Sequence, residues 1–245
     1  MKKSVIIICA LFFLTEIICG QDANEIIRRV EKNMSSENRI FESAMTISGT
    51  RTSRTITSRT WSVGEKQSFT EYLTPAREQG TKMLKLENQL WIYSPSTDRI
   101  IQISGHMLRQ SVMGSDLSYE DMMDDRKITE VYTAEVIGNE DIDSRKTWIL
   151  KLTAKVEDVA YYSRKMWIDS ERYVPLKEEL FAKSGQLLKR TTLSDIKLIE
   201  GRWFPTRMVY KDVMKQGNGT EFVITSAKFD QRIPDYIFSK ASLKQ

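Results

Sequence analysis

The sequence has few of the side chains that most catalytic and metal sites need. It contains one histidine, His106, and two cysteines, Cys9 and Cys19, among 245 residues. A serine-hydrolase triad needs a histidine to accept the proton, and no G-x-S-x-G motif accompanies His106. Zinc sites need several histidine or cysteine ligands. We therefore predict no enzymatic activity, no metal and no cofactor.

Glycine-rich phosphate-binding loops and basic blocks are also missing. The formal net charge is only +4, and charges of both signs alternate along the chain, so nucleic acid is not an expected partner. The acidic residues Glu120, Asp121, Asp124 and Asp125 have helical spacing but lack the glycine-centred turn of a calcium loop. A solvated helix face is the favoured interpretation of this group.

The first 20 residues have the features of a secretory signal peptide. Lys2 and Lys3 precede an apolar run that contains Glu16 and ends at Cys19, and Gly20 offers a cleavage point. The run is short for a membrane-spanning helix. We predict a signal peptide over residues 1–20 and one domain over residues 21–245.

Cys19 raises the alternative of a lipid anchor. A bacterial lipobox has a small residue before the cysteine and usually a leucine three positions before it, whereas this chain has Ile18 and Glu16 there. Export without an anchor is the preferred prediction. Both cysteines would then be removed, and the mature chain would have no thiol or disulfide.

One helix is predicted at the start of the domain. In DANEIIRRVEKNM, Asp22 can cap the helix and Glu25 occupies the capping-box position. The apolar residues at helical spacing are Ile26, Ile27, Val30 and Met34.

From Ile40 onward the apolar pattern has a period of two, which is typical of strands. In the first segment one face carries Phe41, Ser43, Met45 and Ile47, at every second position. A later segment carries Trp148, Leu150 and Leu152 on one face in the same way. Short turns rich in Gly, Asn, Asp and Ser join about eleven to thirteen such segments, so neighbouring strands should be antiparallel. A sheet of this size can close into a barrel, pack on a second sheet or wrap around helices.

Aromatic and methionine side chains are spread over many of these segments. Methionine adapts to variable apolar shapes, and such a set is compatible with a ligand cavity. An ordinary hydrophobic core explains the same composition.

Three motifs relate the chain to a known family. They are LWIYSP (Leu90–Pro95), DRI (Asp98–Ile100) and GSDLSYED (Gly114–Asp121). The segment Gly80–Met123 resembles the outer-membrane lipoprotein-sorting protein family, the LolA-like proteins of Gram-negative bacteria. Residues Met166–Arg190, Gly201–Tyr210 and Ile233–Leu243 extend the resemblance over most of the mature chain.

The resemblance implies a mostly β fold of the α+β type. We expect a single, strongly curved antiparallel sheet that forms an unclosed half-barrel, with the N-terminal helix and short helices plugging its concave side. It further implies a non-enzymatic periplasmic carrier that holds acyl chains of a lipoprotein or lipid in an apolar concavity. Such a carrier would pass them to the outer membrane or a partner, with transient membrane contact.

Candidate site residues follow from the strand pattern and the motif. The predicted cavity residues are Met45, Ile47, Trp61, Phe69, Leu84, Trp91, Tyr93 and Met113. The predicted lid and brace residues are Gly114, Ser115, Asp116, Tyr119 and Asp121, with Gly114 at a bend and Ser115 or Asp116 capping a helix that begins near Leu117. A one-residue slip in strand register would move a predicted cavity residue to the opposite face.

Two other functions remain open. One is a periplasmic adaptor of an RND-type inner-membrane transporter without cargo of its own, because the GSDLSYED signature is associated with relatives of that kind. The other is a lipid-acting hydrolase, which would need converging carboxylates or a Ser/His pair. Neither the cargo nor the donor and acceptor can be read from the sequence.

Overall fold

The computed structural model describes residues 22–49, 52–124 and 126–245. The predicted signal peptide lies outside these residues. Within the described residues, no helix is long and apolar enough to cross a membrane.

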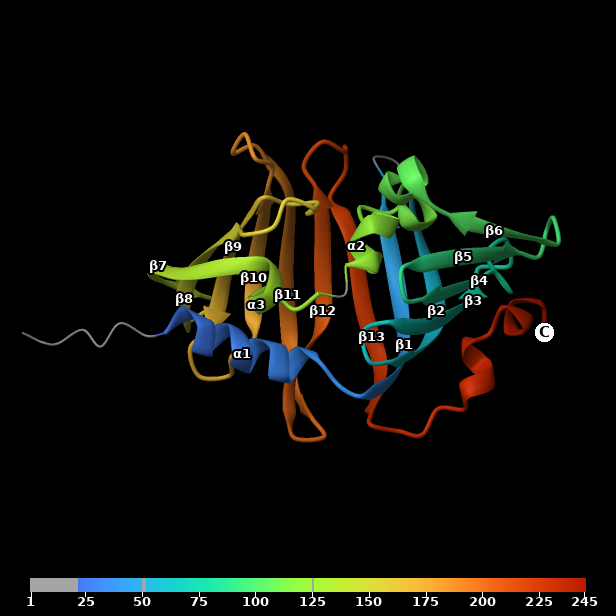
Figure 1. Cartoon of the computed structure of the whole chain (residues 1–245), viewed down its shortest axis with the longest axis horizontal. Coiled ribbons are helices and arrows are strands. Elements are labelled where there is room, and N and C mark those ends of the chain that lie inside the picture. The colour runs from blue at the N-terminus through green and yellow to red at the C-terminus, as the bar shows by residue number, and fades with distance from the viewer. Residues whose placement is uncertain (1–21, 50–51, 125) are drawn as a thin grey trace, which may run out of the picture.

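One antiparallel sheet of 13 strands dominates the molecule, in the order β6-β5-β4-β3-β2-β1-β13-β12-β11-β10-β9-β8-β7 (Figure 1). Two runs of hairpin-linked strands meet where β1 pairs with β13. The strands are β1 (Asn38–Ser48), β2 (Ser53–Val63), β3 (Gln67–Thr74), β4 (Lys82–Leu86), β5 (Gln89–Ser94), β6 (Arg99–Ile103), β7 (Tyr132–Ile142), β8 (Arg145–Ala154), β9 (Ser163–Asp169), β10 (Pro175–Phe181), β11 (Leu187–Ile199), β12 (Arg202–Asp212) and β13 (Gly219–Phe229).

The sheet is not closed, because β6 and β7 form its two edges. The α-helices are α1 (Ala23–Met34), α2 (Tyr119–Met123) and α3 (Ile128–Val131), and the 3-10 helices are η1 (Gly105–Arg109), η2 (Val112–Gly114), η3 (Asp235–Phe238) and η4 (Lys240–Lys244). The expected unclosed half-barrel with few helices is confirmed.

Helix α1 forms where the apolar spacing predicts it. The Asp22 side chain accepts a hydrogen bond of 2.9 Å from the backbone N–H of Asn24 and caps the helix. The capping-box role expected for Glu25 is wrong, because Glu25 accepts hydrogen bonds of 3.0 Å from both Arg28 and Arg29. The buried face of the helix carries Ala23, Ile26, Ile27 and Val30.

The two faces of the sheet differ in what covers them. Directly opposite partners share a face, and one such row crosses seven strands through Leu150, Met166, Glu178, Thr191, Tyr210, Thr220 and Ile47. Helix α1 packs on Leu150 and Met166 of this row. We call the face that contains this row and bears α1, α2 and α3 the inner face, and the other the outer face (Figure 1).

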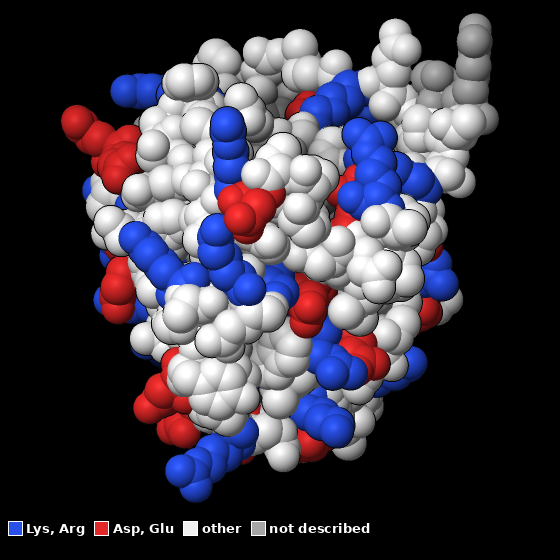
Figure 2. Space-filling model, turned by 90° about the vertical axis from the view of Figure 1, so that its right-hand side faces the viewer, with Lys and Arg blue, Asp and Glu red and all other residues white. Residues whose placement is uncertain are grey.

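The C-terminal segment, residues 230–245, crosses to the outer face and packs on β3, β4 and β5 through η3 and η4. Figure 2 shows the side of the molecule on the right of Figure 1, where basic and acidic side chains are interspersed. This agrees with the alternation of charge along the sequence.

Candidate functional site

The GSDLSYED segment begins with a bend on the inner face. Met113 and Gly114 both have positive φ, 50° and 74°. A Cβ at Gly114 would lie 3.3 Å from the guanidinium of Arg54, which donates to the backbone carbonyl of Met113. Glycine thus suits a bend that Arg54 of β2 holds against the sheet.

Asp116 attaches the segment to the β12–β13 hairpin. Its carboxylate accepts hydrogen bonds of 2.8 Å from Thr220 Oγ1 and 2.9 Å from the backbone N–H of Asp212. The helix cap expected at Ser115 or Asp116 is therefore wrong. The cap is Ser118, which directly precedes α2.

Ser118 and Asp121 form a reciprocal capping box at the start of α2. The Ser118 hydroxyl accepts from the backbone N–H of Asp121 at 3.2 Å, and Asp121 accepts from the backbone N–H of Ser118 at 2.7 Å. Tyr119 packs into a cluster with Met83 and Leu90. A short helix is thus fixed at its first turn.

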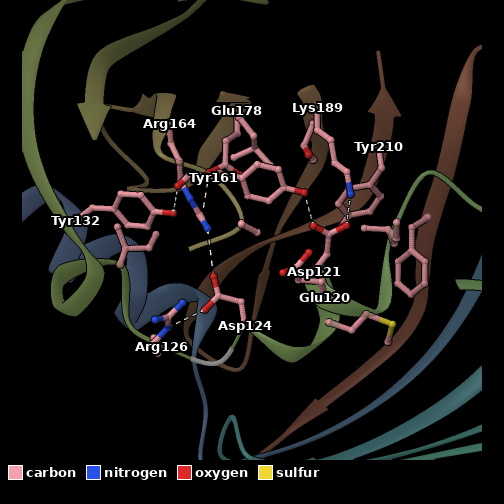
Figure 3. Close-up of a pocket in the computed structure, with 17 residues that line it drawn as sticks. Glu120, Asp121, Asp124, Arg126, Tyr132, Tyr161, Arg164, Glu178, Lys189 and Tyr210 are labelled. Carbon is pink, nitrogen blue, oxygen red and sulfur yellow. Dashed lines mark hydrogen bonds and ion pairs between the residues drawn. The ribbon is translucent and has the colours of Figure 1, made fainter. Parts of the chain in front are cut away.

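Asp121 also ties α2 to the sheet. Its Oδ1 accepts a hydrogen bond of 2.5 Å from the Tyr161 hydroxyl, and its Oδ2 pairs with the Lys189 ammonium of β11 (Figure 3). Burial alone would raise the pKa of Asp121, but Lys189 and Tyr161 outweigh burial and hold this pKa below its usual value. Asp121 is therefore ionised at neutral pH.

A second charged network lies beside the first. Arg164 on β9 pairs with Asp124 and with Glu178, at 3.4 Å each, and its guanidinium lies 4.8 Å from the centre of the Tyr132 ring (Figure 3). Burial raises the pKa of Glu178, and Arg164 opposes that rise. Asp121, Asp124 and Glu178 are thus each paired with a base from the sheet, either Lys189 or Arg164.

A cavity of about 410 Å³ lies between these networks, under α2. This volume falls within the range of small-molecule pockets. Its lining is mixed, because charged side chains surround the apolar residues Leu117, Met122, Ile128, Ala160, Leu180 and Phe222. A cavity of this kind can accept an amphiphilic molecule more readily than a bare hydrocarbon.

The structure divides the eight predicted cavity residues between the two faces. Met45 and Ile47 lie on the inner face and pack in one cluster with Met113. Trp61, Phe69, Leu84 and Trp91 are direct cross-strand partners on the outer face, and Tyr93 shares their cluster. The eight therefore do not form one surface, and a ligand-binding role for them stays a prediction.

The C-terminal segment covers the outer-face group. Ile233, Phe238 and Leu243 are buried against Phe69 and Trp91 in the same cluster. Lys240 Nζ lies 4.1 Å from the centre of the Trp91 ring. These aromatic residues therefore form a core between the sheet and the chain's last residues.

Sequence reasoning missed the residues that face α2 from the sheet and from the β8–β9 loop, which are Tyr161, Arg164, Glu178, Lys189 and Tyr210. Two of them carried a detectable signal. Arg164 continues the alternation of Met166 and Ile168, and Glu178 shares its strand face with Leu180. A charged residue on a buried strand face indicates a partner from elsewhere in the fold. Tyr161 lies in a loop, where no periodicity exists.

His106 is exposed in η1 and does not line the cavity. In the part of the chain that the structure describes, no group of three or more His, Cys, Asp or Glu side chains could hold a metal ion. The site therefore consists of ion pairs, tyrosines and apolar side chains.

Solved structures share this architecture over nearly the whole chain. A DUF1329 family protein from Desulfovibrio piger is 23% identical with a TM-score of 0.82, covering 90% of this chain and 97% of its own. An outer membrane lipoprotein-sorting protein domain from Vibrio parahaemolyticus is 24% identical with a TM-score of 0.78, covering 92% and 98%. A LolA superfamily protein from Nitrosomonas europaea is 25% identical with a TM-score of 0.73, covering 90% and 99%.

These likenesses define the class of the fold as that of LolA-superfamily proteins. No curated protein matches the sequence. A family model with the description "Uncharacterized protein" matches residues 64–245, and the chain belongs to that family. The predicted resemblance to outer-membrane lipoprotein-sorting proteins is thereby confirmed.

Proposed function

We propose that the protein is a periplasmic carrier for an amphiphile with acyl chains, either a lipoprotein or a lipid. The observation that carries this proposal is the cavity between α2 and the inner face, which has apolar side chains beside paired charges. The LolA-superfamily fold supports the same function. Delivery would be to the outer membrane or to a partner protein.

The energetics of transfer explain why such a cavity is useful. Each acyl methylene exposed to water costs about 0.8 kcal/mol, so a lipid crosses an aqueous compartment only when its tail is covered. The tail would lie against Leu117, Leu180 and Phe222, beneath α2. Binding and release need no covalent chemistry.

Helix α2 would serve as the lid. It has only five residues, and besides side-chain packing it is held by the Asp121 contacts with Lys189 and Tyr161 and by Lys85, which donates to the carbonyls of Met122 and Met123. A short element attached by few contacts opens at a lower free energy than the sheet. Opening at an acceptor would release the cargo.

A second candidate function is an adaptor that docks on an RND-type inner-membrane transporter and carries nothing. The observation that favours it is the filling of much of the inner face by α1 and by clusters such as that of Met83, Leu90 and Val112. This candidate needs no ligand in the cavity.

Native mass spectrometry with lipid extraction separates the two candidates. Protein purified from its own periplasm should carry acyl species, in an amount comparable to the protein. A ligand-free mass together with tight binding to a purified inner-membrane transporter would overturn the carrier and establish the adaptor.

A further inference from the structure

Two of the three hairpin loops at one end of the sheet expose large apolar side chains. Met214 in the β12–β13 loop is 70% exposed, Val156 in the β8–β9 loop is 39% exposed and Tyr162 in the same loop is 37% exposed. We call residues 155–162, 182–186 and 213–218 the upper rim; the β10–β11 and β12–β13 loops form tips at the top of Figure 1, and residues 155–162 lie below them. Single exposed apolar residues are common, but a row of them on adjacent loops is informative.

Side-chain contacts join the loops of the upper rim. Lys183 Nζ lies 5.8 Å from the centre of the Tyr162 ring, and Gln186 Nε2 lies 3.7 Å from Met214 Sδ. Lys215 Nζ lies 2.5 Å from Ser111 Oγ and also donates to the backbone carbonyl of Ser115. The rim is therefore one continuous surface that reaches the segment before α2.

The backbone holds the Met214 loop in place. A Cβ at Gly217 would lie 2.6 Å from the carbonyl oxygen of Ser48, and one at Gly219 would lie 2.4 Å from that of Tyr210. Both glycines have positive φ. The loop can pack this closely because neither position has a side chain, and the exposure of Met214 follows from this fixed geometry.

The charges of the rim suit a phospholipid surface. The exposed Lys183 lies beside Tyr162 of the β8–β9 loop, whereas the ammonium of Lys215, next to Met214 in the chain, is bonded within the protein to Ser111 and Ser115. Glu157 and Asp158 also lie in the β8–β9 loop. Lysine stems lie along apolar surface and place their ammonium groups among phosphates, and tyrosine is enriched at the level of lipid headgroups. An apolar tip accompanied by a tyrosine and an exposed lysine is thus typical of an interfacial contact.

A second hollow connects the rim with the cavity under α2. It has a volume of about 280 Å³, and Met214, Lys215 and Leu188 contribute to its lining. It shares Glu120, Ala160, Tyr161 and Lys189 with the cavity. The two spaces are therefore neighbours, and the second opens beside Met214.

We propose that the upper rim docks on a phospholipid bilayer, with the Met214 side chain inserted among the lipids and the exposed Lys183 on the phosphates. The hollow beside Met214 then faces the membrane and forms the mouth through which cargo moves. The docking rests on the rim alone, whereas the role of the mouth rests on the proposed carrier function.

Flotation with vesicles of phosphatidylethanolamine and phosphatidylglycerol tests the docking. The purified protein should bind, and Met214→Asp should weaken binding at least about tenfold, because burying a methionine contributes more than one factor of ten. Leu198→Asp is the matched control. Leu198 is 59% exposed but lies at the opposite end of the sheet, beside the β11–β12 hairpin.

The outcomes separate the docking from the carrier function. Equal binding of Met214→Asp and the parent protein, equal loss in both variants, or no binding by the parent protein would each overturn the docking. Acyl species measured on the same samples report on the carrier. Lipid that copurifies without vesicle binding overturns the docking alone, and vesicle binding by a lipid-free protein overturns the carrier alone.

Discussion

Thr220 on β13 donates a hydrogen bond of 2.8 Å from Oγ1 to Oδ2 of Asp116, which lies 104 residues earlier in the chain. The same hydroxyl oxygen accepts a hydrogen bond of 2.9 Å from the backbone N–H of Asp116. One buried threonine therefore fixes both the carboxylate and the backbone of the segment that leads into α2. This connection sets where the lid begins.

Thr220→Val should lower the free energy of unfolding by about 2 kcal/mol, because it leaves a buried carboxylate short of a donor. Urea denaturation measures the change. Thr225→Val on the same strand is the control, since Thr225 is exposed and donates only to the carbonyl of Glu42. A loss for Thr220→Val no larger than that for Thr225→Val would show that Asp116 is held by its other contacts.

The Asp121–Lys189 pair should make stability depend on pH. The pKa of Asp121 is lowered in the folded protein, so its contribution is fully present above the unfolded value of about 3.9 and is lost as the pH falls through the folded value. Asp121→Asn should lower the free energy of unfolding by about 3 kcal/mol at pH 7, because Lys189 is left without its partner.

A series of urea denaturation curves at different pH values tests whether the stabilisation by Asp121 is lost as the pH falls. The difference between the parent protein and Asp121→Asn should be constant above about pH 5 and shrink below about pH 4. Asp235→Asn, at an exposed position of η3, should stay within about 0.5 kcal/mol of the parent. A difference that grows toward low pH would contradict the assigned ion pair.

The sheet itself could be predicted from the sequence because both of its signals are local. Alternation in segments such as Phe41–Ile47 identifies strands, and short polar turns identify antiparallel neighbours. The cap of α2 is Ser118 and not the predicted Ser115 or Asp116, because several side chains near Leu117 can cap a helix. Asp116 is instead used by Thr220, a partner that only the folded chain brings close.

The cavity residues could not be predicted because side-chain direction depends on register. Met45 lies opposite Ile56 of β2, so these two side chains share a face. Trp61 lies on the same strand as Ile56 at an odd spacing, so its side chain points to the other face. Met45 and Trp61 therefore point to opposite faces although both are apolar. The C-terminal segment that covers Trp61 is distant in sequence, and no local pattern indicates where it packs.

Filling the mouth of the cavity should reduce cargo without harming the fold. Ala160 is exposed and lines both the cavity and the hollow beside Met214, so Ala160→Trp should block this space at little cost in stability. The acyl content after periplasmic purification should fall severalfold. Ala241→Trp, at an exposed alanine of η4, should retain it. Unchanged acyl content in Ala160→Trp would place the cargo elsewhere.

The C-terminal segment should detach from the outer face before the sheet unfolds. Apart from Asp230 N–H to Asn38 O at its start and Gln245 O, which accepts from Lys82 at its end, its backbone hydrogen bonds are local, such as Ile237 N–H to Pro234 O at 3.2 Å. Side chains fix it to the sheet, and Phe238 is its largest buried anchor. Elements held mainly by a few side chains open at low free energy, so Phe238→Ala should speed tryptic cleavage at Arg232 and Lys240 several-fold.

Mass spectrometry of the tryptic products measures this detachment. Tyr236→Ala is the control on the same helical turn, because Tyr236 is 68% exposed and its removal uncovers nothing. Cleavage in Phe238→Ala should stop at the tail and leave the sheet intact, since the 13-strand ladder does not include residues 230–245. Equal cleavage rates in the two variants, or digestion of the whole chain, would show that the segment and the sheet unfold as one unit.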